Sequence, residues 1–366
     1  MLKFGHMNIN NEKPYNLLPF LPPDIDLDDV EILKKVNTAN IALSKLEGSS
    51  LAIPNRNLLI EPLSVREAVA SSGIENINTT VAEIFQAELF PEKIQSKAQK
   101  ETLHYKDALR VGFALIKKQG FLNTNSFLEI QKILEPNKSG VRKLPGTSIK
   151  NSSTGEILYT PPEGEDLIRE LLKNYETYFN NFSDNVDPLI KLAILHYQFE
   201  AIHPFYDGNG RTGRILMVLY LILSERLELP ILFISGFINK NRSDYYRLLN
   251  SVTKNGNWKE WILFILNAIE TQSLETAKTV SEIKKMHHQY KETIKNKLPK
   301  IYTAELVDYL FANPFYSQQS LAQIVGKERK TSAKYLNSLL NENLIKAFRF
   351  KREKIYYCPE LLKLLS

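Results

Sequence analysis

The sequence predicts a mainly α-helical protein with one β-hairpin and a small winged-helix domain at its end. Three observations predict this fold. Apolar residues recur at helical spacing through most of the 366 residues. One stretch, residues 140–162, has short β-prone runs around a turn-rich segment. The last part of the chain reads as three helices followed by a basic hairpin. We therefore expect an N-terminal helical segment over residues 1–95, a core over 96–280, and a linker helix with the winged helix over 281–366.

The composition is that of an ordinary folded protein. Apolar residues make up 43% of the chain, which is enough for a core of normal size. No apolar run is long enough to cross a bilayer, and the first residues lack the apolar core of a signal peptide. The one cysteine, Cys358, excludes an internal disulfide and fits a reducing compartment. We therefore expect a cytoplasmic protein with no membrane partner. The histidines lack zinc spacing, so a structural transition metal is not expected.

Several signals mark helices in the N-terminal segment. Residues 31–48 have helical apolar spacing and end in Gly48, which is typical of a helix C-terminus. Residues 64–67 and 80–83 each have the form of a capping box, Ser-x-x-Glu and Thr-x-x-Glu. These signals predict two helices on either side of the short stretch 71–76.

The segment from His203 to Arg214 lies between two strongly apolar helical stretches. Gly208 and Gly210 allow positive φ angles and let backbone N–H groups approach an anion closely. The helix that begins near Gly210 directs its positive end at the same place. Arg211 and Arg214, three residues apart, share one face of the first turn and can fork onto phosphate oxygens. This spacing predicts a phosphate site.

Two further residues add chemistry to this anion site. Asp207 supplies a hard oxygen ligand, which suits Mg²⁺ that is also held by phosphates. His203 titrates near neutrality and can accept a proton from an attacking hydroxyl. Taken singly, these residues also fit a turn, a helix cap or a packed side chain. Together, at these offsets, they favour phosphoryl or nucleotidyl transfer.

The stretch HPFYDGNGRTGR resembles the Fic family motif, HPFx[D/E]GNGRxxR, at every fixed position. The resemblance covers about residues 10–270 and implies a helical Fic core whose members mostly transfer AMP from ATP to Ser, Thr or Tyr of target proteins. It implies His203 as the general base, Asp207 as the Mg²⁺ ligand and Phe205 as a buried anchor. It also implies that the rest of the loop binds ATP phosphates: Gly208, Asn209, Gly210, Arg211, Thr212, Gly213 and Arg214.

A second resemblance lies upstream of the loop. The stretch from Ser71 to Asn76 is similar to the family's inhibitory motif, [S/T]xxxE[G/N], with Ser71 and Glu75 at the fixed positions. It implies that Glu75 pairs with Arg214 and occupies the guanidinium meant for the γ-phosphate, so that ATP binds in an unproductive pose. The alternative is an ordinary surface glutamate. A homodimer that holds this segment in place is a further open alternative.

Two other stretches resemble parts of the same family. The hairpin over residues 140–162 is similar in position to the family's flap, which holds a target protein by strand addition; the alternative is a plain hairpin. The stretch 241–246 resembles the family's NRxxYY sequence. Either Tyr245 or Tyr246 stacks on adenine, or both pack in the core. We expect His196, two turns before His203, to be structural.

We therefore predict an auto-inhibited protein adenylyltransferase that uses ATP and Mg²⁺ and modifies a target protein and itself. Within this class, another nucleotide or a phosphocholine donor, or removal of AMP with Glu75 orienting a water, are alternatives. The alternative from another class is a DNA-binding regulator that acts through the winged-helix tail. That tail, residues 298–366, has eleven basic and six acidic residues.

Overall fold

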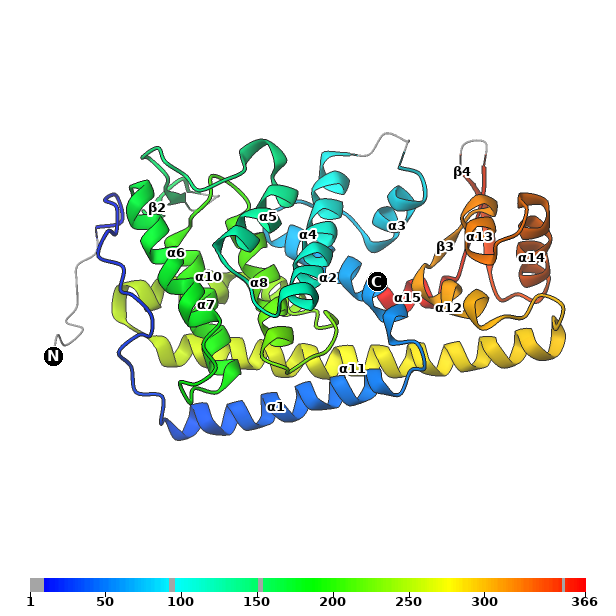
Figure 1. The fold of residues 1–366 in the computed structure, drawn as a ribbon, viewed down its shortest axis with the longest axis horizontal. Helices are drawn as coiled ribbons and strands as arrows, with labels where there is room; N and C mark the ends of the chain where they lie inside the picture. The colour runs from blue at the N-terminus through cyan, green and yellow to red at the C-terminus, as the bar shows by residue number, and fades with distance from the viewer. Residues whose placement is uncertain (1–9, 92–95, 151–153, 351–352) are drawn as a thin grey trace. The chain divides into compact units, whose positions relative to one another are not determined.

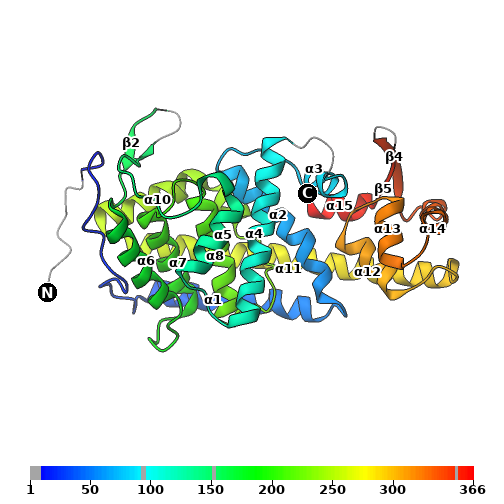
Figure 2. The ribbon, with the colours of Figure 1, turned by 45° about the horizontal axis from the view of Figure 1, so that its top comes forward.

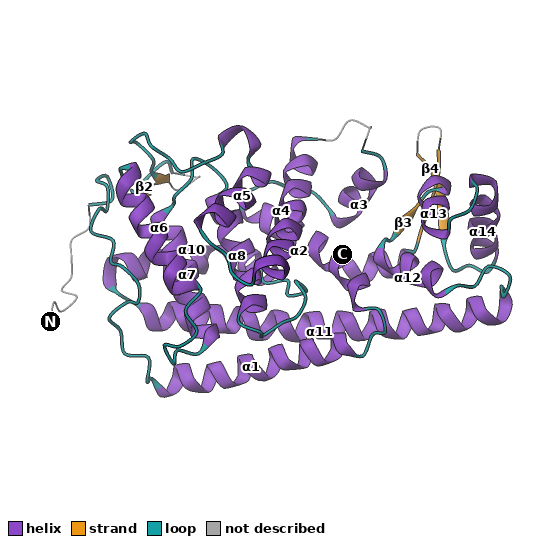
Figure 3. Ribbon diagram, in the orientation of Figure 1, coloured by secondary structure: helices purple, strands orange, loops and turns teal. Residues whose placement is uncertain are grey.

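The computed structural model of the protein describes residues 10–91, 96–150, 154–350 and 353–366. The described chain is mainly helical, with a two-stranded hairpin and a three-stranded sheet (Figures 1 and 3). This confirms the predicted fold class. Among the described helices, none combines the length and apolar character that a membrane crossing requires. The chain forms two compact units. The first comprises Met1–Ser44, His104–Pro230 and Ile234–Gln272, and the second comprises Lys45–Leu103, Ile231–Phe233 and Ser273–Ser366. Helices α1 (Val30–Leu51), α4 (Lys97–Gln119) and α11 (Trp258–Lys297) each contribute residues to both units.

The first unit is a helical bundle with α7 and α8 packed side by side at its centre (Figures 1 and 2). Almost every residue of these two helices is buried, as their apolar sequences predict. The bundle is built from α5 (Thr124–Leu134), α6 (Glu165–Phe179), α7 (Pro188–Ile202), α8 (Asn209–Leu223), α9 (Ser235–Lys240) and α10 (Arg242–Asn255), with parts of α1 (Val30–Leu51), α4 (Lys97–Gln119) and α11 (Trp258–Lys297).

Local sequence explains where the central helices begin and how closely they pack. Asp187 caps α7, its side chain accepting the N–H of Leu189 at 2.8 Å, and Pro188 occupies the first turn, where no N–H is needed. On α4, a Cβ added at Gly112 would lie only 2.3 Å from Cδ1 of Leu219 on α8. A residue without a side chain is therefore required for α4 and α8 to approach this closely.

The predicted hairpin is present in the first unit. Strands β1 (Ile149–Lys150) and β2 (Ile157–Tyr159) pair antiparallel, with Ile149 opposite Tyr159. Most of the predicted turn, residues 151–153, lies outside the described residues. The hairpin therefore lies between α5 and α6 in the chain, within the predicted range 140–162.

The second unit contains a winged-helix arrangement at the end of the chain. Its sheet has the strand order β3-β5-β4, with all neighbours antiparallel. Strand β3 and helix α15 were not predicted. The elements of this unit are the 3₁₀ helix η1 (Arg56–Leu59), α2 (Ile60–Ile74), α3 (Val81–Leu89), α12 (Ala304–Ala312), β3 (Phe315–Tyr316), α13 (Gln318–Val325), α14 (Arg329–Asn341), β4 (Lys346–Phe350), β5 (Glu353–Tyr357) and α15 (Pro359–Leu365).

One of the two predicted capping boxes is confirmed and the other is wrong. Thr80 accepts the N–H of Glu83, and the Glu83 carboxylate accepts the N–H of Thr80 at 2.8 Å. Ser64, in contrast, lies inside α2, which begins four residues earlier at Ile60. The end predicted at Gly48 is also wrong, because α1 continues to Leu51. Burial of Leu46 and Ser50, one turn apart, offsets the roughly 1 kcal/mol cost of a glycine inside a helix.

Candidate nucleotide-binding site

The histidine of the motif sits at the end of α7 in an unusual backbone conformation. His203 has φ 49° and ψ 58°, the left-handed region, and its N–H closes the helix by donating to the carbonyl of Phe199 at 3.0 Å. This conformation is unfavourable for a residue with a side chain, so the surrounding contacts must hold it in place. Gly208 also adopts positive φ, 76°, where α8 begins. The two left-handed residues reverse the chain between two buried helices.

The side chain of Asn209 holds this reversal together. Its Oδ1 accepts the N–H of Phe205 and its Nδ2 donates to the carbonyl of Phe205, both at 2.8 Å. Phe205 is completely buried and its ring lies against that of Phe199. Phe205 is thus the buried anchor that the sequence predicts. Both polar groups of the Asn209 amide are used within the loop, so its predicted phosphate contact stays a prediction.

Both arginines of the motif lie in the first two turns of α8 and are almost completely buried. Nη2 of Arg211 is 2.5 Å from Oε1 of Glu135, the residue that follows α5, and 3.9 Å from Oδ1 of Asp207. Glu135 is a site residue that sequence reasoning missed, because a lone glutamate after a helix carries no motif. Its side chain also covers Gly208, where an added Cβ would lie 3.1 Å from Cγ of Glu135.

Asp207 is half-exposed at the mouth of the loop and accepts two hydrogen bonds. Lys138, in the 3₁₀ helix η2 (Pro136–Lys138), donates Nζ to Oδ2 at 2.6 Å, and the N–H of Gly208 donates to Oδ1 at 2.8 Å. Partial burial raises the pKa of Asp207, but these hydrogen bonds and the charges of Lys138 and Arg211 outweigh it and lower that pKa. Asp207 is therefore a carboxylate at neutral pH, as a Mg²⁺ ligand must be.

Close packing between α7 and α8 sets the position of the motif's last residues. A Cβ at Gly213 would lie 2.5 Å from Oε1 of Glu200 and 3.4 Å from Cε1 of His196, so this position has no room for a side chain. His196 is buried, and its Nε2 lies 2.9 Å from the hydroxyl of Tyr245. Burial, with the charge of Arg214, lowers the pKa of His196 to about 3. His196 is thus a neutral residue of the core.

The two tyrosines of residues 241–246 have different surroundings. Tyr245 is 1% exposed and its ring packs among those of His196, Trp261 and Phe264, which favours the packing alternative for this residue. Tyr246 is 39% exposed. Stacking of Tyr246 on adenine stays a prediction.

The region predicted as the flap, residues 140–162 (the flap region), and the motif loop, residues 203–214, are joined by a backbone bridge and by hydrogen bonds to one side chain. Val141 pairs with Phe205 in an isolated antiparallel bridge. The hydroxyl of Tyr206, at the variable position of the motif, accepts the N–H of Lys143 at 2.8 Å and that of Leu144 at 3.4 Å. Sequence reasoning gave Tyr206 no role, because the motif places no constraint on this position.

Ser71 and Glu75 belong to the second unit. Ser71 is buried in the last turn of α2, and Glu75 is the exposed residue at which that helix ends. The stretch 71–76 was expected to lie between two helices, but its first four residues are helical. The helix extends over them because Ser71, Ser72, Gly73 and Ile74 are all buried in its last turn. The pairing of Glu75 with Arg214 stays a prediction.

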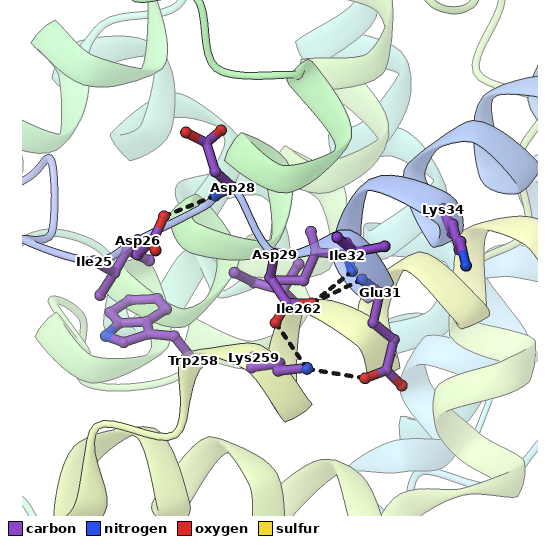
Figure 4. Close-up of a pocket in the computed structure, with 11 residues that line it drawn as sticks. Ile25, Asp26, Asp28, Asp29, Glu31, Ile32, Lys34, Trp258, Lys259 and Ile262 are labelled. Carbon is purple, nitrogen blue, oxygen red and sulfur yellow. Dashed lines mark hydrogen bonds and ion pairs between the residues drawn. The ribbon is translucent and has the colours of Figure 1, made fainter.

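A separate cavity of about 720 Å³ lies on the first unit, between residues 25–34 and the start of α11 (Figure 4). Its charged lining is mainly acidic. Lys259 bridges Asp29 at 2.8 Å and Glu31 at 2.9 Å, and its hydrogen bond is the main reason why the pKa of Asp29 is lowered. An acidic lining repels a polyphosphate, so this cavity does not compete with the motif loop as a nucleotide site.

Comparison with known proteins gives matches along most of the chain. Residues 33–114 match the N-terminal region of the Fic/DOC family, residues 121–221 match the Fic/DOC family itself, and residues 286–361 match the C-terminal domain of SoFic-like protein adenylyltransferases. A protein adenylyltransferase Fic from Nematostella vectensis is 25% identical over 252 residues, 68% of this chain and 56% of its own length. One from Aedes aegypti is 30% identical over 153 residues, 41% of this chain and 29% of its own length. The chain thus spans about half, or less, of the length of these relatives.

Solved structures show the same fold at low sequence identity. A Fic family protein from Desulfovibrio desulfuricans superposes with a TM-score of 0.59 at 19% identity, covering 92% of this chain and 98% of that one. Fic-1 from Caenorhabditis elegans, residues 134–508, superposes with a TM-score of 0.51 at 19% identity, covering 68% and 72%. The helical core and its loop between α7 and α8 therefore define a Fic-type protein. The chain belongs to the Fic/DOC family and has a SoFic-like C-terminal domain.

Proposed function

We propose that the protein is an auto-inhibited adenylyltransferase, which transfers AMP from ATP to a hydroxyl of a target protein and of itself. The observation that carries the proposal is the loop from His203 to Arg214. It has the complete Fic motif, places a half-buried histidine at the end of α7, and buries two arginines at the start of α8. Buried guanidiniums at a helix N-terminus suit the phosphates of a nucleotide.

In the proposed reaction, His203 accepts the proton of the attacking hydroxyl. The hydroxyl oxygen forms a bond to the α-phosphorus of ATP, and the bond from that phosphorus to the bridging oxygen of the β-phosphate breaks. Pyrophosphate leaves with the electron pair of the broken bond. The left-handed backbone of His203 turns this residue out of the last turn of α7, so the imidazole need not follow the helix.

The carboxylate donors at the loop fit a magnesium ion that is held mainly by phosphates. Asp207 is ionised and half-exposed, whereas the nearby Glu135 carboxylate is paired with Nη2 of Arg211. Mg²⁺ commonly binds one or two carboxylates together with nucleotide phosphates and water. When bound, the ion would neutralise phosphate charge. Asp207 would hold it and would release Lys138 in doing so.

Inhibition is proposed to act through Glu75 and Arg214. A carboxylate paired with the Arg214 guanidinium competes with the γ-phosphate for the same donors, and a displaced γ-phosphate moves the α-phosphate out of line with the attacking oxygen. What supports this is the resemblance of residues 71–76 to the inhibitory motif, the exposure of Glu75 at the end of α2, and the complete Fic motif downstream.

Intact mass spectrometry after incubation with ATP and Mg²⁺ tests both parts of the proposal. We expect weak addition of AMP to the wild type, much stronger addition to Glu75→Gly, and none to His203→Ala in the Glu75→Gly background. His288→Ala, which changes an exposed histidine, is the matched control and should label like its parent. Equal labelling of all these proteins would contradict the proposal. Parallel incubations with UTP, GTP and CDP-choline identify the donor, and incubation of pre-labelled protein with the wild type detects removal of AMP.

A DNA-binding role for the winged helix is the second candidate, and one observation favours it. Basic side chains just before and on α14, and on the hairpin of β4 and β5, are exposed to solvent. They are Lys327, Arg329, Lys330, Lys334, Lys346, Arg349 and Lys354; Lys351 and Arg352 lie outside the described residues. Titration of the full chain with duplex DNA at increasing salt tests this role. We expect binding that Lys330→Glu with Lys334→Glu removes and that Lys363→Glu, on α15, retains. No binding at low salt would rule it out.

A further inference from the structure

Arg142 is a buried arginine near the start of the flap region. Its side chain is 1% exposed, and it donates hydrogen bonds to three backbone carbonyls. Nε donates to His203 at 2.7 Å, and Nη2 donates to Ile202 at 3.2 Å and to Pro162. Pro162 is the last residue of the region predicted as the flap, whereas Ile202 and His203 form the end of α7. One guanidinium therefore links the far end of the flap region to the histidine.

Both sides of the hairpin make further hydrogen bonds to the same segment. The N–H of Arg142 donates to the carbonyl of Pro204 at 2.9 Å, directly after the histidine. On strand β2, the hydroxyl of Tyr159 donates to the carbonyl of Ala201 at 2.9 Å. The two chain ends that enter and leave the hairpin thus both attach to residues 201–205, and Arg142 takes part in both attachments.

The chemistry of arginine explains why this residue type suits the position. The last carbonyls of a helix have no partner within the helix, and they carry the negative end of its dipole. A planar guanidinium has five donors in a fixed fork and reaches several carbonyls at once, whereas a lysine has one nitrogen. Burial lowers the pKa of Arg142, with partial compensation by the nearby Glu163 carboxylate. The guanidinium stays charged at neutral pH because the ordinary pKa of arginine lies far above neutrality.

We propose that Arg142 is a positioning residue, which fixes the flap region and the backbone of His203 relative to each other. A hydroxyl presented by a segment bound along the hairpin is then held at a set distance from the imidazole. Misplacing reacting groups by about 1 Å can cost about 100-fold in rate. This role rests on the proposed function, because the flap matters for catalysis only if a protein hydroxyl is the acceptor.

Hydrogen exchange tests the structural link without any reference to activity. In Arg142→Met we expect amide exchange to accelerate about tenfold or more, both in residues 141–150 and in residues 203–206. Lys191→Met is the matched control, because Lys191 is an equally buried cation at the opposite end of α7 that bonds Asp184 and the carbonyl of Asn181. It should leave both segments unchanged. Unchanged exchange in either segment of Arg142→Met would overturn the proposal.

Self-labelling in the Glu75→Gly background tests the catalytic consequence. At saturating ATP we expect Arg142→Met to lower the rate constant about 10- to 100-fold, with less than a threefold change in the ATP concentration for half-maximal rate. Arg142→Lys keeps one donor nitrogen, so its rate constant should lie between those of the parent and of Arg142→Met. It also tests the proposal if the Arg142→Met variant does not fold. An unchanged rate constant would overturn the positioning role. If the Glu75→Gly parent itself does not label, the proposed function fails, and the exchange result alone decides whether Arg142 links the two segments.

Discussion

Arg211 and Glu135 are joined by an ion pair in which Nη2 lies 2.5 Å from Oε1. Arg211 comes from the first turn of α8, and Glu135 follows α5, 76 residues earlier in the chain. The side chain of Arg211 is 4% exposed and that of Glu135 is 16% exposed. A phosphate that binds Arg211 must therefore share its guanidinium with the Glu135 carboxylate or displace that carboxylate.

Replacing Glu135 by glutamine should tighten the binding of ATP. The amide keeps the shape of the side chain but removes the negative charge that competes with phosphate, and we expect the dissociation constant to fall about three- to tenfold. Isothermal titration of the His203→Ala protein, which should not turn over, measures this. Glu129→Gln, an exposed change on α5, should have no effect. Weaker binding in Glu135→Gln would show that the carboxylate instead holds Arg211 in its binding orientation.

Replacing Asn209 by alanine should both destabilise the protein and disorder the loop. The change leaves the N–H and carbonyl of the buried Phe205 without the amide that bonds them, which costs about 2–3 kcal/mol of unfolding free energy. Asn180→Ala is a matched control, because Asn180 makes the same pair of bonds to the backbone of Leu122.

Urea unfolding followed by tryptophan fluorescence measures this loss. Both tryptophans of the chain, Trp258 and Trp261, lie in the first unit and report on it. We expect a similar loss of stability from both alanine variants, but weaker ATP binding only from Asn209→Ala. Normal ATP binding by Asn209→Ala would mean that the loop binds ATP without the hydrogen bonds between Asn209 and Phe205.

Replacing Lys138 by methionine should raise the pKa of Asp207 toward its ordinary value of 3.8. The reason is the loss of the hydrogen bond from Nζ, the strongest of the effects that lower this pKa. A carboxylate whose pKa is lower in the folded protein stabilises the fold. That stabilisation is complete above pH 3.8 and is lost as the pH falls through the lowered pKa. Carbon-13 NMR of the aspartate carboxyls measures the shift, and Lys132→Met, on α5, should leave it unchanged.

His196 should make the protein less stable as the pH falls below neutrality. Its pKa is about 3 when folded and 6.5 when free, so between these values only the unfolded chain takes up the proton. The unfolding free energy then falls by up to about 1.4 kcal/mol for each pH unit below 6.5. Urea unfolding at pH 7, 6 and 5 should show a smaller slope in His196→Gln. The exposed His288→Gln should keep the wild-type slope, and an equal slope in all three proteins would contradict the assignment.

The motif loop could be predicted from the sequence because its parts are close in the chain. Gly208 adopts positive φ and α8 begins at Asn209, as the spacing implies, and Phe205 is buried, as the family resemblance implies. Gly210, which was expected to allow positive φ as well, instead lies within the helix. The capping box at Thr80 was also readable, since it joins residues only three apart. The similar pattern at Ser64 failed because buried residues on either side extend α2 through it. A capping pattern predicts a helix start only where packing allows one.

The contacts that surround the loop could not be predicted in the same way. Glu135, Lys138 and Arg142 belong to no motif, and each is 60 or more residues from its partner in the loop. A lone charged residue has many solvated conformations open to it, and no local pattern says which distant group it meets. Tyr245 shows the same limit, since packing or adenine stacking was equally open until its burial was known.

Hydrophobic periodicity and residue spacing act over a few turns of chain, so they were enough to predict the helical fold, the winged helix and the chemical character of the loop. The carboxylate that faces Arg211, and the contacts that hold His203 in its left-handed conformation, could be known only from the folded protein. Those contacts depend on how α5, the flap region and α7 pack together. Burial makes a correctly paired charge favourable and an unpaired one costly, and burial is a property of the assembled fold.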